Sequence, residues 1–299
     1  MDVLYTFVWY HGGMKNFNLF PAETARQLHY ILFDIDDTIT TNGHLTAEAY
    51  AALWALHENG LILIPVTGRP AGWCDMIIRQ WPVRAVIGEN GAFAFYWPES
   101  SAGGYAELTH PQADPKSRKY LSMLRDICLE QVPGCRVARD QFARRYDLAI
   151  DFCEDEPKLG LEAANAIRDI CVERTAKAKV SSIHVNIWFG DYDKQSMAKM
   201  LLTEVFSEKA PEHDIFGKPT NESLAASYLS KSLYFGDSPN DEPMFGLFPY
   251  ACAVANIHPF LDQIKKRPAY VTGGESGLGF AQAAAHLLAL RGAASFLPK

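Results

Sequence analysis

Three carboxylates crowd together in the segment at residues 31–40, which reads ILFDIDDTIT. The apolar residues before them are typical of a buried strand, so Asp34, Asp36 and Asp37 lie where that strand leaves the core. Like charges this close repel one another and resist removal from water. A bound cation compensates such a cluster and keeps it ionised, and the segment therefore predicts a metal site.

Two other segments also place polar side chains at the end of a predicted strand. The strand LILIPV is followed by Thr67, Gly68 and Arg69. The strand in SLYFGD leads into a second acidic group: Asp237, Ser238, Asn240 and Asp241. In an open parallel sheet, ligands bind outside the carboxyl ends of the strands, so we expect these residues to share one edge of the sheet.

The residue types at this edge suit a divalent cation together with an anion. Carboxylate oxygens are ligands that Mg²⁺ prefers, and this ion usually binds one or two of them along with phosphate oxygens and water. Lys194 adds a positive charge at the start of a predicted helix, and Thr67 adds a hydroxyl. The pattern predicts a Mg²⁺ site that also binds an anion such as phosphate.

The elements that must position these residues alternate between short apolar strands and amphipathic helices from residue 30 onward. This alternation predicts the α/β class, with a doubly wound parallel sheet that has helices on both faces. The alternation stops near residue 89 and resumes near residue 188. We expect an N-terminal extension at residues 1–27 and a discontinuous core at residues 28–88 and 188–299. An inserted α+β domain is expected at residues 89–187.

Several elements have clear predicted bounds. In the core we expect a strand in RAVIG at 84–88, a helix over 193–206 and a last helix over 276–290. In the insert we expect two long helices, at about 116–131 and about 159–174.

Two segments of the insert alternate with period two and are predicted to be strands. The segment KVSSIHVNIWF at 179–189 reads as one strand whose polar face carries Ser182, His184 and Asn186. In RRYDLAIDF, Asp147 and Asp151 lie on the polar face. If the helices cover the apolar faces, these polar side chains are free to line a pocket for a sugar-like leaving group; a solvated sheet face is the alternative.

Four short motifs resemble, in order, those of the haloacid dehalogenase superfamily: DIDDT, VTGR, the DK after the insert and GDSPND. The insert between the second and third motifs is similar to that of the type IIB branch. This branch holds the Cof-like, sucrose-phosphate, trehalose-phosphate and mannosyl-phosphoglycerate phosphatases and the phosphomannomutases. The resemblance extends from about residue 30 to the end, and it implies a Rossmann-like core with a cap domain of the C2B type.

The resemblance also implies residue roles in phosphoryl transfer. Asp34 would be the nucleophile that forms an aspartyl-phosphate, and Asp36 would be the general acid and base. Thr67 and Lys194 would bind the phosphoryl oxygens. The Mg²⁺ ligands would be Asp34, the backbone carbonyl of Asp36, Asp237 and Asp241, the last directly or through another ligand.

Several assignments keep an alternative. Lys218 in FGKPTNE is a second candidate for the phosphate-binding lysine, but we favour Lys194 because it lies where the insert ends. Asp37 and Thr38 either shape the turn after the strand or contact substrate. The remaining expected substrate contacts are Gly68, Arg69, Asn90 and Asn240.

The composition favours a small-molecule substrate. The chain has 299 residues and a net charge of −7, without a Lys/Arg-rich run that would bind nucleic acid or an anionic membrane. Six scattered cysteines without a C-x-x-C motif predict reduced thiols in a cytoplasmic protein. The apolar segment VLYTFVWY is too short to span a bilayer and lacks the basic residues of a signal peptide. We expect a monomer or a homodimer.

Three functions are consistent with these residues. The first is a Mg²⁺-dependent phosphatase that acts on a small phosphorylated metabolite, with a sugar phosphate favoured. The second is a phosphomutase, which returns the phosphoryl group to the sugar. The third is a catalytically silent protein that binds a phosphorylated ligand, although the presence of both Asp34 and Asp36 argues against it.

Overall fold

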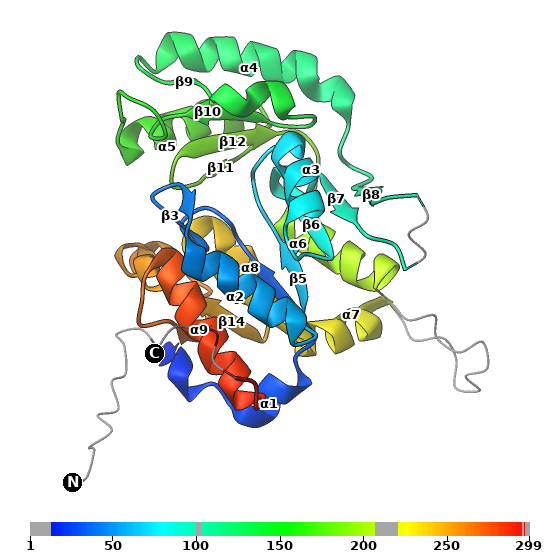
Figure 1. Cartoon of the computed structure of the whole chain (residues 1–299). Coiled ribbons are helices and arrows are strands. Elements are labelled where there is room, and N and C mark those ends of the chain that lie inside the picture. Colours follow the sequence, from blue (N-terminus) through cyan, green and yellow to red (C-terminus); the bar gives the residue numbers. More distant parts are fainter. Residues whose placement is uncertain (1–12, 100–102, 207–220, 295, 297–299) are drawn as a thin grey trace. The chain divides into compact units, whose positions relative to one another are not determined.

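The computed structural model describes residues 13–99, 103–206, 221–294 and 296 (Figure 1). The chain divides into two compact units. The first unit comprises the chain up to Leu63 and from Leu229 onward, and the second comprises Ile64–Tyr228. The second unit thus includes the Thr67 and Lys194 regions as well as the insert, while the domain boundaries expected from the motifs stay a prediction.

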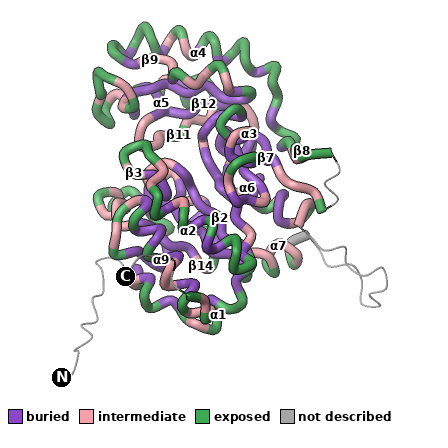
Figure 2. Tube along the Cα trace, viewed as in Figure 1, coloured by how far each residue is buried: buried purple, intermediate pink, exposed green. Residues whose placement is uncertain are grey.

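The first unit is organised around a sheet of six strands, one of which, β5, continues into the second unit. Their order across the sheet is β1 (Lys15–Asn16), β15 (Tyr270–Val271), β14 (Tyr250–Ala253), β13 (Ser232–Gly236), β2 (Tyr30–Phe33) and β5 (Ile62–Pro65). The neighbours from β1 to β2 all pair in parallel. The central strands β2 and β13 are buried along their whole length. The tube is purple at the β2 label in Figure 2. The predicted parallel sheet is confirmed.

Four α-helices lie wholly within the described part of the first unit: α1 (Ala22–Gln27), α2 (Ala47–Glu58), α8 (Glu242–Leu247) and α9 (Ser276–Leu290). The hydroxyl of Thr46 accepts a hydrogen bond from the backbone N–H of Ala49 and so begins α2 with a side-chain cap. Helix α2 packs against α9, whose bounds agree with the prediction. A two-stranded hairpin, β3 (Thr40–Thr41) and β4 (His44–Leu45), follows the acidic turn.

Residues 14–28, which the sequence pattern placed largely in an extension, contribute to the core of the first unit. Strand β1 extends the sheet beside β15, and Met14, Phe17, Phe20 and Leu28 are buried. The ring of Phe17 lies 5.0 Å from that of Phe20 and 5.7 Å from that of Phe235 on β13, between ring centroids. This segment therefore packs directly on the sheet that carries Asp237.

A small antiparallel sheet lies in the second unit and corrects one prediction. It consists of β6 (Ala85–Gly88), β7 (Phe93–Tyr96) and β8 (Ala106–Thr109), and α3 (Ala71–Gln80) packs on it. The RAVIG strand was predicted for the parallel sheet, but it pairs with β7 and makes a single parallel bridge, from Ile87 to Val66. The tight turn η2 (Glu89–Gly91) reverses the chain at once, so an antiparallel hairpin forms.

The insert forms an antiparallel sheet covered by two helices, labelled near the top of Figure 1. Its strand order is β11 (Lys177–Val180), β12 (His184–Trp188), β10 (Leu148–Asp151) and β9 (Arg136–Val137). Helices α4 (Arg118–Gln131) and α5 (Leu161–Val172) bury their apolar side chains with those of β10 and β12 in one core. The predicted helices and the apolar faces of both segments are confirmed.

The segment KVSSIHVNIWF was predicted as one strand, and this is wrong. It forms the end of β11, a turn and β12, and the two strands pair with each other in antiparallel fashion. The hydroxyl of Ser181 accepts from the backbone N–H groups of Ile183 and His184, and such a local bond competes with a continuous strand. Ser182 consequently lies in the turn and not on the polar face of β12.

Two helices complete the second unit. Helix α6 (Lys194–Met200) continues into a wider turn of π-type at Leu201–Val205, within the predicted helix over 193–206. Helix α7 (Asn221–Ser230) leads back to β13. All six cysteines are free thiols, as predicted. Within the described residues we find no helix with the length and apolar character needed to cross a membrane.

Candidate active site

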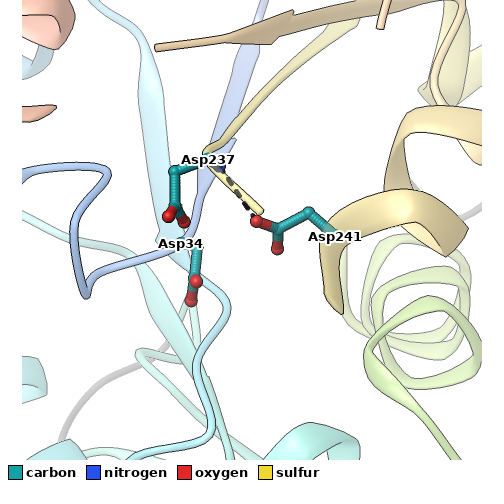
Figure 3. Close-up of side chains that lie close together, drawn as sticks. All are labelled: Asp34, Asp237 and Asp241. Atoms are coloured by element: carbon teal, nitrogen blue, oxygen red, sulfur yellow. Dashed lines mark hydrogen bonds between the residues drawn. The ribbon is translucent and has the colours of Figure 1, made fainter. Parts of the chain in front are cut away.

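Three buried carboxylates gather where two neighbouring strands end in the first unit. Asp34 follows β2 and Asp237 follows β13, and the pairing of Phe33 with Phe235 brings these two strand ends level. Asp241 lies at the end of the short turn after β13. One oxygen from each carboxylate lies within 4.8 Å of the others. Figure 3 shows the three side chains close together. The predicted meeting of these acids at one sheet edge is therefore observed.

The surrounding polar groups hold Asp237 in place. Thr38 Oγ1 donates to Asp237 Oδ1 at 3.2 Å, and Asn256 Nδ2 lies 3.5 Å from Asp237 Oδ2. Asp241 Oδ2 accepts from the backbone N–H of Asp237 at 3.0 Å, the dashed bond in Figure 3. Asp241 Oδ1 accepts from the Tyr234 hydroxyl at 2.6 Å. Asp241 thus organises the loop that carries Asp237, in addition to any contact of its own with a metal ion.

Asp36 and Asp37 lie in the turn that follows Asp34, and both are half-buried. Asp37 has a φ of 56°, a left-handed conformation that Asp adopts more readily than most residues, and its backbone N–H donates to Thr40 Oγ1 at 3.0 Å. The carbonyl of Ile35 accepts from three successive backbone N–H groups of this turn. Asp37 therefore shapes the turn, one of its two expected roles.

The chemistry of the carboxylates fits a magnesium ion. Three buried carboxylates this close are stable together only when a cation or added protons balance their charge. Burial, followed by the charge of Asp241, raises the pKa of the Tyr234 hydroxyl, which therefore remains a donor to that carboxylate. All the candidate ligand atoms are oxygens, which Mg²⁺ prefers over softer ligands. Asp34 and Asp237, with Asp241 beside them, are suited to hold the ion.

The loop of Thr67, Gly68 and Arg69 belongs to the second unit. The backbone N–H of Thr67 donates to the carbonyl of Ile87 at 2.9 Å, and the backbone N–H of Arg69 donates to Thr67 Oγ1 at 3.0 Å. These bonds fix the loop, while the Thr67 hydroxyl retains its own hydrogen to donate. A hydroxyl held in this way suits the recognition of an anionic oxygen.

Lys194 lies where the chain leaves the insert. It is the first residue of α6 and is buried, and Asp193 before it forms a capping box with Ser196 after it. Gly91, which lies where the chain enters the insert, has a φ of +103° and touches Asp193 so closely that a Cβ there would be 2.1 Å from the Asp193 carbonyl oxygen. The entering and leaving segments therefore cross in direct contact beside Lys194.

The polar face of the insert is confirmed in its orientation, but its carboxylates are engaged. Asp151 lies opposite His184, and Asn186 lies opposite Ala149, so these side chains share the face away from the apolar core. Asp151 accepts from Arg136 Nε at 3.1 Å. Asp147, which precedes β10, accepts from Arg144 at 2.9 Å and from Asn90 at 3.3 Å. Neither carboxylate is an open hydrogen-bond partner for a sugar.

Comparison with known proteins shows what the chain resembles. Residues 31–113 match the family model of haloacid dehalogenase-like hydrolases. This segment, which includes Asp34 and Thr67, is therefore similar to the haloacid dehalogenase-like hydrolases. No curated protein sequence matches it significantly.

Solved structures share the fold of this chain at low sequence identity. The C-terminal domain of trehalose-6-phosphate phosphatase from C. albicans is 16% identical with a TM-score of 0.63, over 91% of this chain and 96% of that chain. Sucrose-phosphatase from Synechocystis sp. PCC6803 is 16% identical with a TM-score of 0.55, over 88% and 98%. A subclass IIB sugar phosphatase is 14% identical with a TM-score of 0.56, over 86% and 98%. The insert is consistent with the cap of that subclass.

One residue that the sequence analysis missed ties the Thr67 loop to the insert. Glu89 is fully buried, and its carboxylate accepts from the backbone N–H groups of Ala71, Arg145, Tyr146 and Asp147 at 2.6–3.2 Å. Burial, followed by the nearby charge of Asp147, raises the pKa of Glu89 to about 7, although these backbone donors act in the opposite direction. In the sequence, Glu89 reads only as part of a tight turn.

Glu154 was also missed, because it lies in an irregular loop after β10. It lies 2.9 Å from His184 Nε2 and 3.2 Å from Arg69 Nη1. The hydrogen bond from His184, together with the charges of His184 and Arg69, holds the pKa of Glu154 at about 2, although partial burial opposes the shift. Arg69 also stacks on Trp73, with its guanidinium carbon 4.3 Å from the ring centroid. Arg69, expected at the phosphate loop, thus links that loop to the cap.

The predicted site residues are distributed over both units. Those of the first unit are Asp34, Asp36, Asp237, Asn240 and Asp241. Those of the second unit are Thr67, Gly68, Arg69, Asn90, Ser182, His184, Asn186 and Lys194. Asn240 is half-buried and accepts from the Ser238 hydroxyl at 3.1 Å. The alternative lysine, Lys218, lies outside the described residues.

Proposed function

We propose that the protein is a Mg²⁺-dependent phosphatase that hydrolyses a small phosphorylated metabolite through an aspartyl-phosphate. The observation that carries this proposal is the buried group of Asp34, Asp237 and Asp241 at the ends of two adjacent parallel strands. Carboxylates in such a place are costly unless they bind a cation. The superfamily match adds the expectation that this cation works with a phosphate ester.

In the proposed reaction, Asp34 attacks phosphorus and the bond to the leaving oxygen breaks. Asp36 donates its proton to that oxygen and later takes one from the water that hydrolyses the aspartyl-phosphate. The half-buried position of Asp36 is compatible with this exchange, because the group has access to solvent. A bound Mg²⁺ would supply electrostatic stabilisation of the phosphoryl oxygens.

Thr67 and Lys194 are proposed to bind the phosphoryl oxygens. The Thr67 hydroxyl would donate a hydrogen bond, and the ammonium of Lys194 would offset negative charge as it develops. The capping box at Asp193 and Ser196 supports this assignment, since it fixes the start of the helix on which Lys194 lies. Asp36 contributes its backbone carbonyl to the proposed set of metal ligands.

A sugar phosphate is the proposed substrate class. Two of the proteins that share the fold are named for trehalose 6-phosphate and for sucrose phosphate. The cap face near the Thr67 loop carries neutral polar groups, of which Asn90, His184 and Asn186 are the proposed sugar contacts. A cytoplasmic location and a monomeric or homodimeric state are part of the same proposal.

The test is a phosphate-release screen over phosphorylated metabolites with Mg²⁺, run for the wild type and for Asp34→Asn. We expect release by the wild type and a loss of at least about 10³-fold in the variant. Asp37→Asn is the matched control, because Asn also tolerates the left-handed backbone at that position, and it should retain activity. Release that survives Asp34→Asn would contradict the mechanism, and an isomerised ester without released phosphate would favour a phosphomutase.

A further inference from the structure

Three charged side chains and a histidine meet beside the Thr67 loop; they are called here the Glu154 cluster and consist of Arg69, Asp140, Glu154 and His184. Arg69 Nη1 lies 3.2 Å from Glu154 and 3.5 Å from Asp140. The two basic side chains are only 6% and 3% exposed, for Arg69 and His184. Glu154 is 33% exposed and Asp140 is 14% exposed. The two carboxylate side chains are therefore the more accessible members of the cluster.

The neighbouring basic groups do not offset this charge. Arg144 has a fully buried side chain, and its Nη1 is engaged by both oxygens of Asp147 and by the Gly68 carbonyl at 2.8–3.1 Å. With Asp147 included, three carboxylates, those of Asp140, Asp147 and Glu154, stand against the guanidinium groups of Arg69 and Arg144. Three further pairs around the cluster each contain one charge of each sign: Arg136 with Asp151, Arg139 with Asp155 and Arg145 with Glu107.

An unsatisfied acceptor lies next to the same loop. Among the described residues, Asn186 Oδ1 is a buried side-chain oxygen without a hydrogen-bond partner. The Asn186 amide is in close contact with Gly68, where an added Cβ would be 2.5 Å from Asn186 Nδ2. A buried acceptor without a partner is unfavourable, so a ligand that brings an O–H or N–H group to it is stabilised.

We propose that the leaving group of the substrate is a donor-rich sugar that carries no negative charge, with Glu154 and Asn186 accepting its hydroxyl or ammonium hydrogens. This inference rests on the proposed phosphatase function and concerns the selection of its substrate. The carboxylate of Glu154 repels a leaving group that bears a carboxylate or a second phosphate, since like charges in a partly buried site are weakly screened. Neutral hexose phosphates and amino sugar phosphates fit; sugar acid phosphates do not.

The experiment compares three esters that are phosphorylated at the same carbon: glucosamine 6-phosphate, glucose 6-phosphate and 6-phosphogluconate. Their leaving groups are cationic, neutral and anionic. We expect kcat/KM for each of the first two to exceed that for the third by at least about tenfold with Mg²⁺ at low salt. Raising the NaCl concentration from about 0.05 to about 0.5 M should bring the kcat/KM values of the three esters closer together in the unmodified protein. This salt measurement does not depend on whether a variant folds.

The substitution Glu154→Gln tests the residue. It should raise KM for the amino sugar ester and reduce the discrimination against the acid at least about threefold. Glu107→Gln is the matched control, because Glu107 has the same exposure of 33% and also pairs with an arginine, Arg145 at 2.9 Å. It should leave the relative kcat/KM values of the three esters unchanged.

Two outcomes would overturn different statements. If the acid ester is hydrolysed as well as the neutral one, or better, or if the best substrates of a broad screen have anionic leaving groups, the charge selection is wrong and the phosphatase function stands. If no ester releases phosphate, the proposed function itself fails, and the inference that rests on it fails too. Release from neutral and cationic esters only, with the Glu154→Gln effect, supports the proposal.

Discussion

The segments that enter and leave the insert cross at Gly91. This contact predicts the effect of one substitution, Gly91→Ala. An alanine Cβ at this position would lie 2.1 Å from the carbonyl oxygen of Asp193 and 2.9 Å from the backbone nitrogen of Lys194. Both atoms belong to backbone, so they cannot move aside as a flexible side chain does. The added carbon therefore forces the entering and leaving segments apart.

The expected cost has two parts. A φ of +103° is unfavourable for alanine by about 1–2 kcal/mol even without a clash. Overpacking against fixed neighbours typically adds a further 1–3 kcal/mol or so. We expect Gly91→Ala to lower the free energy of unfolding by about 3 kcal/mol or more, and to lower kcat/KM because the start of the Lys194 helix moves.

Urea unfolding measures the stability, and phosphate release from the best substrate measures the activity. Gly104→Ala is the matched control, because Gly104 has a φ of +98° in the same unit and an added Cβ would have no atom within 4 Å. It should cost only the backbone part, about 1–2 kcal/mol, and leave activity intact. Equal effects of the two substitutions on stability and activity would contradict the close contact between Gly91 and Asp193.

Three further predictions concern the core, the metal and the pH dependence. Phe17→Ala should destabilise the protein by about 3–5 kcal/mol in urea unfolding, since its ring packs on Phe235, and a change below about 1 kcal/mol would contradict that packing. Mg²⁺ should raise the Tm of the wild type by about 2 °C or more, whereas Asp237→Asn should abolish the shift; an unchanged shift would argue for another metal site. The pKa of Glu154 lies near 2, below its ordinary value of 4.5, so its contribution to stability is present above about pH 4.5 and is lost as the pH falls toward 2. Because a third of Glu154 is exposed, Glu154→Gln should reduce this loss of unfolding free energy at acid pH by only about 1–2 kcal/mol. An identical pH dependence of stability in the wild type and the variant would show that the pair with His184 does not stabilise the fold.

The elements of the core could be predicted well because their patterns are local. The apolar strand before Asp34 and the last helix at Ser276–Leu290 follow from periodicity alone. The strand RAVIG was assigned to the wrong sheet because its apolar run is compatible with either a parallel or an antiparallel partner. Which partner it takes is decided by the turn at Glu89–Gly91, where Glu89 and Asn90 have positive φ.

The acidic part of the site was also predictable, whereas the cap side was only partly so. Asp34 and Asp237 follow adjacent strands, and the rule that parallel strands end at one edge is enough to bring them together. Alternation placed His184 and Asn186 correctly on one face. It could not reveal that Asp147 is neutralised by Arg144, because the partner of a charge depends on side chains that converge from loops.

The motif segment ILFDIDDTIT by itself determined a strand that ends in acids, and it led to the predictions of a metal site and of a family resemblance. All three depend on residue types at fixed short spacing. Only the tertiary structure decided what Glu89 and Glu154 do. Glu89 joins Ala71 to the start of β10, and Glu154 joins Arg69 to His184, across 18 to 85 positions of sequence. Such contacts have no local periodicity, since they form only when the packed elements exclude water and leave a buried charge to find its partner.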